Sequence, residues 1–271
     1  MKNNKISIAY SPCPNDTFIF YALANNKIDT MGISYEITIA DVEQLNSRAM
    51  KGQYDVSKLS FAVLARLGNR YRLLNAGAAL GNGCGPLIIA RPGFKPDSLK
   101  NARIAIPGRY TTAALLLTLF LDSKPNAVSM PFDRIMVAVS SGECDAGVII
   151  HEGRFTFQDY GLTEVIDLGK WWEDTFGLPI PLGGIAVRSD IGDKISGRIE
   201  ETIRNSLLYA RQYPDQAADY IKAHARELSD DVIAHHIDLY VNNYSIDMGE
   251  TGAKAVSLLF EKAEKTSLNG S

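Results

Sequence analysis

The chain has 271 residues, of which 46% are hydrophobic and 22% are charged. This length and composition allow one large domain or two moderate lobes with a sizeable buried core. The formal net charge of −3 disfavours nucleic-acid binding, and the sequence contains no basic stripe with interleaved aromatic residues.

The first block of the chain, up to residue 91, alternates between strand and helix patterns. Strands are expected over residues 5–10, 33–39, 54–56, 71–79 and 86–90, and helices over 17–25, 42–49 and 61–67. We expect Asn15 or Asp16 to cap the first of these helices and Asp41 to cap the second. Residues 57–60 are expected to form a loop that leads into the third helix.

The same alternation starts again in a second block. A strand is expected over residues 102–106, a helix over 111–122 and a helix face at Phe132, Ile135, Met136 and Val139. An apolar run over 146–150 predicts a buried strand, and another strand is expected over 183–187. The rest, from about residue 193, has helical patterns, including 214–225, 230–242 and 250–265.

These two blocks predict an α/β protein with two lobes. We expect a larger lobe made of residues 1–91 and 184–271, to which the C-terminal helices return, and a smaller lobe made of residues 92–183. The apolar strands 87–90 and 184–187 are expected as the crossovers between the lobes. A cleft between two α/β lobes is a common place for small-ligand sites.

Compartment and cofactors are constrained by what the sequence lacks. It has no secretory signal pattern and no apolar run of roughly 20 residues, so we expect a cytoplasmic protein without membrane attachment. The three cysteines, Cys13, Cys84 and Cys144, are widely spaced and predict neither a zinc site nor a disulfide framework. We expect no metal, and Cys13 is expected to be a small buried thiol. The sequence leaves open whether the chain forms a homodimer.

Three expected strand-to-helix loops carry polar groups suited to a small anion. Residues 11–16 (SPCPND) precede a helix start, whose free N–H groups can hold a carboxylate or a hydroxyl. Lys58 could pair with a substrate carboxylate, and Thr111 and Thr112 place two hydroxyls at a helix N-terminus. Each loop also has an ordinary explanation, namely a capped helix or a surface lysine.

His151 is the strongest catalytic candidate. It follows the strand 146–150, and ligands in open α/β sheets bind at the carboxyl ends of strands. Histidine is also the side chain best suited to move a proton near neutral pH. The alternative is a histidine that closes the strand with a backbone hydrogen bond. Glu152 and Arg154 fit an internal ion pair, and Arg154 alternatively fits a bidentate contact with a carboxylate.

Five further side chains have structural explanations that we favour. His235 and His236 are neighbours on an expected helix and point about 100° apart, so they cannot easily share a metal. With His224 they are expected at the surface. Trp171 and Trp172 are expected to pack in the core, although either ring could stack on an aromatic ligand.

Several segments together resemble a known enzyme family. In chain order they are residues 11–18 (SPCPNDTF), 58–60 (KLS), 111–112 (TT), 151–154 (HEGR) and 177–183 (GLPIPLG). The chain resembles the 1,4-dihydroxy-6-naphthoate synthases of the futalosine branch of menaquinone biosynthesis. The resemblance extends from Ile6 to about Phe260, and none of the segments departs from the family pattern.

The resemblance implies a two-lobed, type II periplasmic-binding-protein-like fold with a ligand cleft, used as a cytoplasmic enzyme. It implies cleavage of cyclic dehypoxanthinylfutalosine to 1,4-dihydroxy-6-naphthoate and dihydroxyacetone without cofactor or metal. His151 matches the family's proton acceptor. Substrate contacts map onto Lys58, Leu59, Ser60, Thr111 and Thr112, to which the residue-level argument adds Asn15, Asp16 and Arg154.

Two other functions stay open at this point. A chorismate dehydratase-like enzyme shares the fold and parts of the pattern, although His151 favours the naphthoate enzyme. A non-catalytic solute-binding protein that captures a small anion has the same fold, because fold does not fix function. In each case the expected partner is a small-molecule carboxylate, with no nucleic acid and no membrane.

Overall fold

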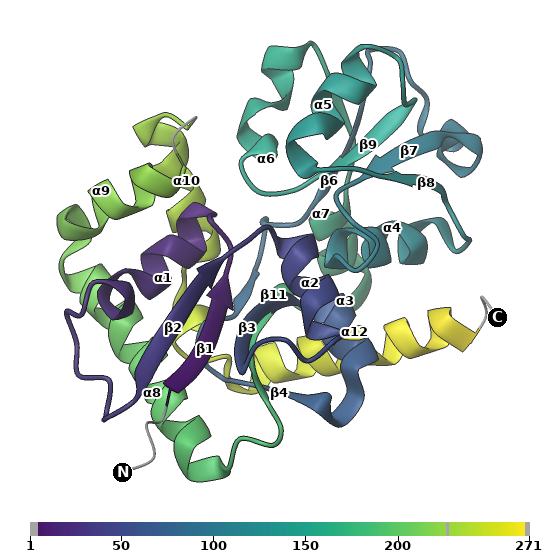
Figure 1. Ribbon diagram of the computed structural model, residues 1–271. Coiled ribbons are helices and arrows are strands. Elements are labelled where there is room, and N and C mark those ends of the chain that lie inside the picture. Colours follow the sequence, from purple (N-terminus) through teal and green to yellow (C-terminus); the bar gives the residue numbers. More distant parts are fainter. Residues whose placement is uncertain (1–4, 226–227, 269–271) are drawn as a thin grey trace.

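The computed structural model describes residues 5–225 and 228–268, and within them the chain forms two β-sheets with helices packed around each (Figure 1). The first sheet has the strand order β2-β1-β3-β11-β4, with β5 beside β11. Its strands are β1 (Lys5–Tyr10), β2 (Ser34–Ile39), β3 (Val56–Ser60), β4 (Tyr71–Leu73), β5 (Ala79–Gly81) and β11 (Ile180–Arg188). β1 runs parallel to β2 and β3, whereas β11 runs antiparallel to β3.

The second sheet has the strand order β10-β6-β9-β7-β8. Its strands are β6 (Leu87–Ala90), β7 (Arg103–Ile106), β8 (Asn126–Ser129), β9 (Ala146–Ile149) and β10 (Thr163–Asp167). β7 is parallel to both β8 and β9, so the carboxyl ends of these three strands lie at the same edge of the sheet. β6 runs antiparallel to its neighbours β9 and β10.

The helices divide between the two sheets. Along the chain they are α1 (Pro14–Ala24), α2 (Val42–Ala49), α3 (Phe61–Leu67), α4 (Thr112–Leu121), α5 (Phe132–Ser140), α6 (Gly153–Thr156), α7 (Leu168–Phe176), α8 (Asp193–Gln212), α9 (Pro214–His224), α10 (Asp230–Tyr240), α11 (Asn243–Ile246) and α12 (Gly249–Leu268). α8, α9 and α10 contact α1, and α12 contacts both α3 and α4. The chain after β11 therefore returns to the first sheet, as the green-to-yellow ribbon in Figure 1 shows.

The chain crosses between the sheets at different places from those expected. The strand 87–90 is no crossover, because it pairs with β9 and β10 inside the second sheet. Residues 184–187 lie within β11 and pair with β3 in the first sheet. Sheet membership therefore changes between Gly81 and Leu87, and again between β10 and β11. A short apolar run has the same sequence pattern whether it lies within a sheet or crosses between lobes, so periodicity did not distinguish the two.

Several local differences from the expected elements involve residues predicted for the ligand site. α1 begins at Pro14, because proline is favoured in the first turn of a helix, and its N-cap is Cys13. Asn15 and Asp16 therefore lie inside the first turn and do not cap it. Residues 57–60 belong to β3 and are not a loop, since they pair with β11. Asp41 caps α2 as predicted, accepting a hydrogen bond from the N–H of Glu43.

Other elements were not expected at all. β8 and β10 form the edges of the second sheet and are partly exposed, so they lack a clear apolar pattern. α7 contains Trp171 and Trp172, and the latter is fully buried, with its indole N–H donating to the Pro179 carbonyl. The strand pattern over 71–79 divides into β4 and β5.

One apolar core connects the two sheets. A single cluster of buried side chains includes Leu59 of the first sheet, Ile104 and Val148 of the second, and Trp172 of α7. Apolar packing therefore continues from one lobe into the other. Among the helices of the described ranges, none combines the length and the apolar character that a membrane span requires.

Candidate active site

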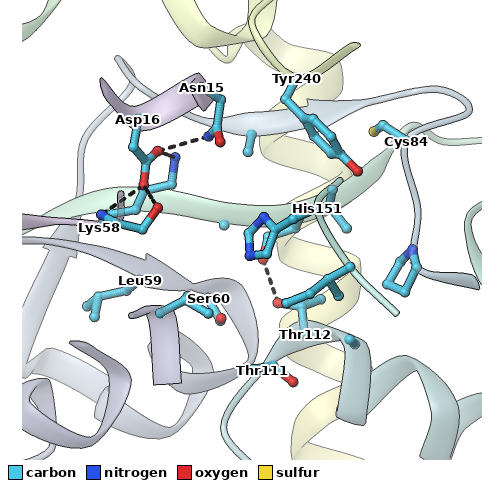
Figure 2. Close-up of a pocket in the computed structure, with 18 residues that line it drawn as sticks. Asn15, Asp16, Lys58, Leu59, Ser60, Cys84, Thr111, Thr112, His151 and Tyr240 are labelled. Atoms are coloured by element: carbon cyan, nitrogen blue, oxygen red, sulfur yellow. Dashed lines mark hydrogen bonds and ion pairs between the residues drawn. The ribbon is translucent and has the colours of Figure 1, made fainter. Parts of the chain in front are cut away.

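A cavity of about 90 Å³ lies where the two sheets meet, and Figure 2 shows the side chains around it. The first sheet contributes residues that follow β1, residues of β3 and residues of β11. The second sheet contributes the first turn of α4 and the residues after β9. The cavity is therefore built by segments far apart in the sequence. Of the residues predicted for the site, it is lined by Asn15, Asp16, Lys58, Leu59, Ser60, Thr111, Thr112 and His151.

His151 lies two residues after the end of β9 and two before the start of α6. Its backbone φ is 56°, in the left-handed region that a residue with a Cβ rarely adopts. Such a conformation costs of the order of 1 kcal/mol or more, and it persists where the surrounding structure imposes it. The imidazole projects into the cavity (Figure 2), and its buried Nε2 has no hydrogen-bond partner within residues 5–225 and 228–268.

Lys58 and Asp16 form a buried ion pair. Lys58 Nζ lies 2.8 Å from Asp16 Oδ1, and the two side chains are only 7% and 2% exposed. Lys58 also donates to the Gly77 carbonyl, while Asp16 accepts hydrogen bonds from Ser11 and from Asn15 Nδ2. The lysine charge is thus already compensated by Asp16. The ordinary alternative of a surface lysine does not apply, because the side chain is buried. The predicted contact of Lys58 with a substrate carboxylate stays a prediction.

Ser60 lines the cavity and is held in place by Asn46. Its N–H donates to Asn46 Oδ1, and its Oγ accepts from Asn46 Nδ2, each at 3.0 Å. Asn46 Nδ2 also approaches the Tyr110 carbonyl at 3.4 Å, which joins α2 to the loop before α4. Sequence analysis missed Asn46. The available signal was its place next to Leu45 in a helix whose apolar face is buried.

The first turn of α4 presents mainly backbone groups. Thr111 caps the helix: its Oγ1 accepts from the Ala114 N–H and donates to the Gly108 carbonyl. Thr112 Oγ1 donates to the Leu182 carbonyl and accepts from the Ala62 N–H. Both hydroxyls are therefore engaged within the protein. The N–H groups in the first turn have no acceptor inside the helix and carry the positive end of its dipole.

Arg154 does not line the cavity. Its guanidinium donates to the Gly85 carbonyl at 2.7 Å and to Asp167 Oδ2 at 2.5 Å. The predicted substrate contact at Arg154 is therefore not what the structure shows. The structural alternative applies, with Asp167 and not Glu152 as the ion-pair partner. The hydrogen bond to Gly85 joins α6 to the segment between Gly81 and Leu87, which crosses between the sheets.

The surface position predicted for His236 is wrong. Its side chain is fully buried, and its Nε2 lies 3.0 Å from Asn15 Oδ1. The ring lies 6.1 Å from that of His151, with the two planes 18° apart. The sequence signal for its burial was the aromatic Tyr240 four residues on, because residues i and i+4 share a helix face. Tyr240 lines the cavity.

Two thiols near the site stay protonated. Burial is the main cause that raises the pKa of Cys13 well above its usual value, with Glu152 and Asp16 adding to it. Burial also raises the pKa of Cys84, which lines the cavity, to about 12. A thiolate nucleophile is therefore disfavoured at either position, in agreement with the buried thiol predicted at Cys13.

Comparison with solved structures identifies the class of fold. The periplasmic aliphatic sulphonate binding protein SsuA from Escherichia coli superposes with a TM-score of 0.70 at 13% identity, over 98% of this chain and 87% of that one. This similarity shows the fold alone. It confirms the prediction of a two-lobed α/β fold of the periplasmic-binding-protein type.

Closer relatives define the family. A family model described as menaquinone biosynthesis matches residues 6–265. A 1,4-dihydroxy-6-naphtoate synthase from Thermus thermophilus is 46% identical over 263 residues, which cover 97% of this chain and 95% of the relative. A crystal structure of a protein from Archaeoglobus fulgidus matches with a TM-score of 0.93 and 40% identity, covering 99% of this chain and 100% of that one. The chain belongs to the menaquinone biosynthesis family, and the predicted resemblance is confirmed.

Proposed function

We propose that the protein acts as a 1,4-dihydroxy-6-naphthoate synthase with His151 as its general base. Its substrate would be cyclic dehypoxanthinylfutalosine, and its products 1,4-dihydroxy-6-naphthoate and dihydroxyacetone. The name of the Thermus thermophilus relative supports the activity. The role of His151 rests on its Nε2, which is buried and has no hydrogen-bond partner among the described residues, while the residue lines the cavity between the lobes.

The substrate carboxylate is best placed at the first turn of α4. Thr111, Thr112 and Ala113 of this turn line the cavity, and a helix N-terminus favours an anion. Lys58 is a poorer partner, because Asp16 already compensates its charge. The Ser60 hydroxyl is free to donate to a second oxygen of the substrate. The carboxylate and this second contact would fix the substrate relative to His151.

The chemical step needs a base and a fixed substrate geometry. Neutral His151 accepts the proton of a substrate hydroxyl at Nε2, and the electron pair of that O–H bond becomes the second bond of a carbonyl. The adjacent carbon–carbon bond breaks in a retro-aldol sense, and its electron pair passes to the ring fragment as an enolate. Gain of aromatic character in that fragment lowers the barrier. This route draws on no cofactor.

The cavity must enlarge for the substrate to enter. Sites for small molecules usually measure about 300–1,000 Å³, several times the volume found here. Contacts between the lobes close the cavity, among them the Tyr110 N–H donating to the Glu43 carboxylate. Separation and closure of the lobes would then admit the substrate and exclude water during the reaction. We also propose that the enzyme is cytoplasmic, as its biosynthetic family suggests.

An assay of the purified protein tests this function, and it has three distinguishable outcomes. We expect turnover of cyclic dehypoxanthinylfutalosine and release of dihydroxyacetone. Turnover of chorismate instead would identify a dehydratase, and binding of the carboxylate without turnover would identify a solute-binding protein.

The role of His151 is tested in the same assay with two variants. His151→Ala and His151→Asn should lower kcat by about 10²- to 10⁴-fold while substrate binding is largely kept. Isothermal titration with the substrate measures that binding. Unchanged kcat in both variants would remove His151 from the mechanism.

A further inference from the structure

Two imidazoles meet at the cavity, and only one of them has a role in the proposed mechanism. In the described ranges, three buried side-chain polar atoms lack a hydrogen-bond partner, and two of these are His151 Nε2 and His236 Nδ1. The two rings belong to different lobes, since His151 follows β9 and His236 lies on α10. Their centroids are 6.1 Å apart. Unsatisfied buried polar atoms are rare, so two on adjacent rings indicate a function.

The hydrogen bonds around Asn15 determine the tautomer of His236. The Asp16 carboxylate only accepts hydrogen bonds, so the Asn15 group that contacts it at 2.9 Å must be the Nδ2 amide hydrogen. Asn15 Oδ1 therefore faces His236, and it accepts the proton carried by Nε2. A neutral ring with its proton on Nε2 has a lone pair on Nδ1. His236 is thus a fixed hydrogen-bond acceptor beside His151.

The surroundings keep His236 neutral. Burial is the main reason that its pKa lies well below the usual value, and positive charge at His151 or Lys58 lowers it further. Other titratable groups nearby come from α1, β3, α10 and the adjoining loops, among them Asp16, Lys58, Tyr240, Glu152, Arg154, Asp41, Cys13 and Cys84. Asp16 and Lys58 compensate each other, and burial raises the pKa of Tyr240.

We infer that His236 is the positioning residue for His151. No hydrogen bond joins the two near-parallel rings within the described residues, and a rotation of either ring on substrate binding would let His236 Nδ1 accept from His151 while that ring carries the substrate proton. The inference rests on the proposed role of His151 as base. Phe132 contacts the ring of His151 edge-on, with centroids 5.4 Å apart, so His236 and Phe132 together limit its rotation. A base oriented by a further hydrogen-bonding group is the arrangement of the catalytic triads, and such contacts commonly shorten when the substrate is bound.

Two variants separate the effect of the His236 Nδ1 lone pair from the effect of its ring packing. His236→Gln keeps an N–H donor for Asn15 but removes the ring lone pair, and His236→Phe keeps the ring shape without either nitrogen. Each should lower kcat by about 10- to 100-fold, with KM changed by less than about threefold. The acidic limb of the kcat–pH profile should move to lower pH, because the protonated form of His151 loses its acceptor. His235→Gln, the neighbouring exposed histidine, should leave kcat and the profile unchanged.

A spectroscopic readout tests the inference without activity. Histidine 15N chemical shifts in the wild type should show His236 as the neutral Nε2–H tautomer well below the pH at which a free histidine titrates. Titration of His236 near its usual pKa, or an unchanged kcat–pH profile in both variants, would overturn the inference.

Failure of the two proposals can be told apart. If the wild type does not turn over the substrate, the proposed function fails, and the 15N spectra still decide the role of His236. If the wild type is active while both variants keep its kcat and pH profile, only the role of His236 fails. Circular dichroism establishes folding, and if His236→Phe does not fold, His236→Gln and the wild-type spectra decide.

Discussion

At the scale of residues, the ion pair between Lys58 and Asp16 has the largest structural consequence. Asp16 accepts hydrogen bonds from Lys58 Nζ, from Asn15 Nδ2 and from both the N–H and the Oγ of Ser11. This network fixes the loop after β1 to β3. It also orients the amide of Asn15, on which the tautomer of His236 depends. Removal of one partner would leave an uncompensated buried charge.

Lys58→Met should therefore destabilise the protein strongly. We expect the free energy of unfolding to fall by about 3–5 kcal/mol, the usual cost of breaking a buried ion pair from one side. Lys170→Met is the matched control, because Lys170 pairs with Asp174 on the surface, where solvent screens the pair and its contribution to stability is small. Urea unfolding measures both. Similar losses in the two variants would contradict a structural role for the buried pair.

The sequence predicted single candidate residues better than their pairings. His151 could be chosen because it follows an apolar strand, and chain position alone indicates the carboxyl end of a sheet. Lys58 was expected to be free for a ligand, because its partner Asp16 is 42 residues away and depends on β1 lying next to β3. His236 was placed at the surface, because the face that α10 turns toward α1 is fixed only by tertiary packing.

At the scale of elements, the segments that cross between the sheets are tightly packed. Gly85 lies against Gly169 at the start of α7, and a Cβ added at Gly85 would be 2.2 Å from the Gly169 Cα. Arg154 holds the same segment through the Gly85 carbonyl while it pairs with Asp167, which caps α7. These contacts give the lobe connection a defined geometry, about which separation of the lobes would occur.

Gly85→Ala should disturb this connection. The added methyl would meet backbone atoms that cannot move independently, so we expect a loss of about 1–3 kcal/mol in the free energy of unfolding, as is usual for overpacking. Gly197→Ala is the control: its added Cβ would meet no atom within 4 Å, and it lies inside α8. That change should stabilise the protein by about 0.5–1 kcal/mol. Thermal or urea unfolding that gives both variants the same sign would contradict the packing described.

Elements with strong periodicity were predictable, and short ones at sheet edges were not. β1, α4 and β9 lie within a residue or two of the expected ranges, because their apolar residues are buried on the expected faces. β8 and β10 were missed, because edge strands bury fewer side chains. β3 was mistaken in part for a loop, because its serines and lysine are polar although buried.

At the scale of the whole molecule, the two lobes are closed on each other. Apolar packing continues from one sheet into the other, and hydrogen bonds such as that from Thr112 Oγ1 to the Leu182 carbonyl cross between segments of the two lobes. The two-lobed fold was predictable, because two blocks repeat the alternation of strand and helix. The degree of closure was not, because it depends on contacts between residues far apart in the chain.

A crystal structure of His151→Asn with bound cyclic dehypoxanthinylfutalosine tests the central claim most directly. The variant lacks the proposed base, so the substrate should persist between the lobes in an enlarged cavity. The account predicts the reacting hydroxyl within hydrogen-bond distance, about 2.6–3.2 Å, of the side chain at position 151, and the carboxylate at the first turn of α4. A substrate bound elsewhere, or with its hydroxyls turned away from position 151, would contradict it.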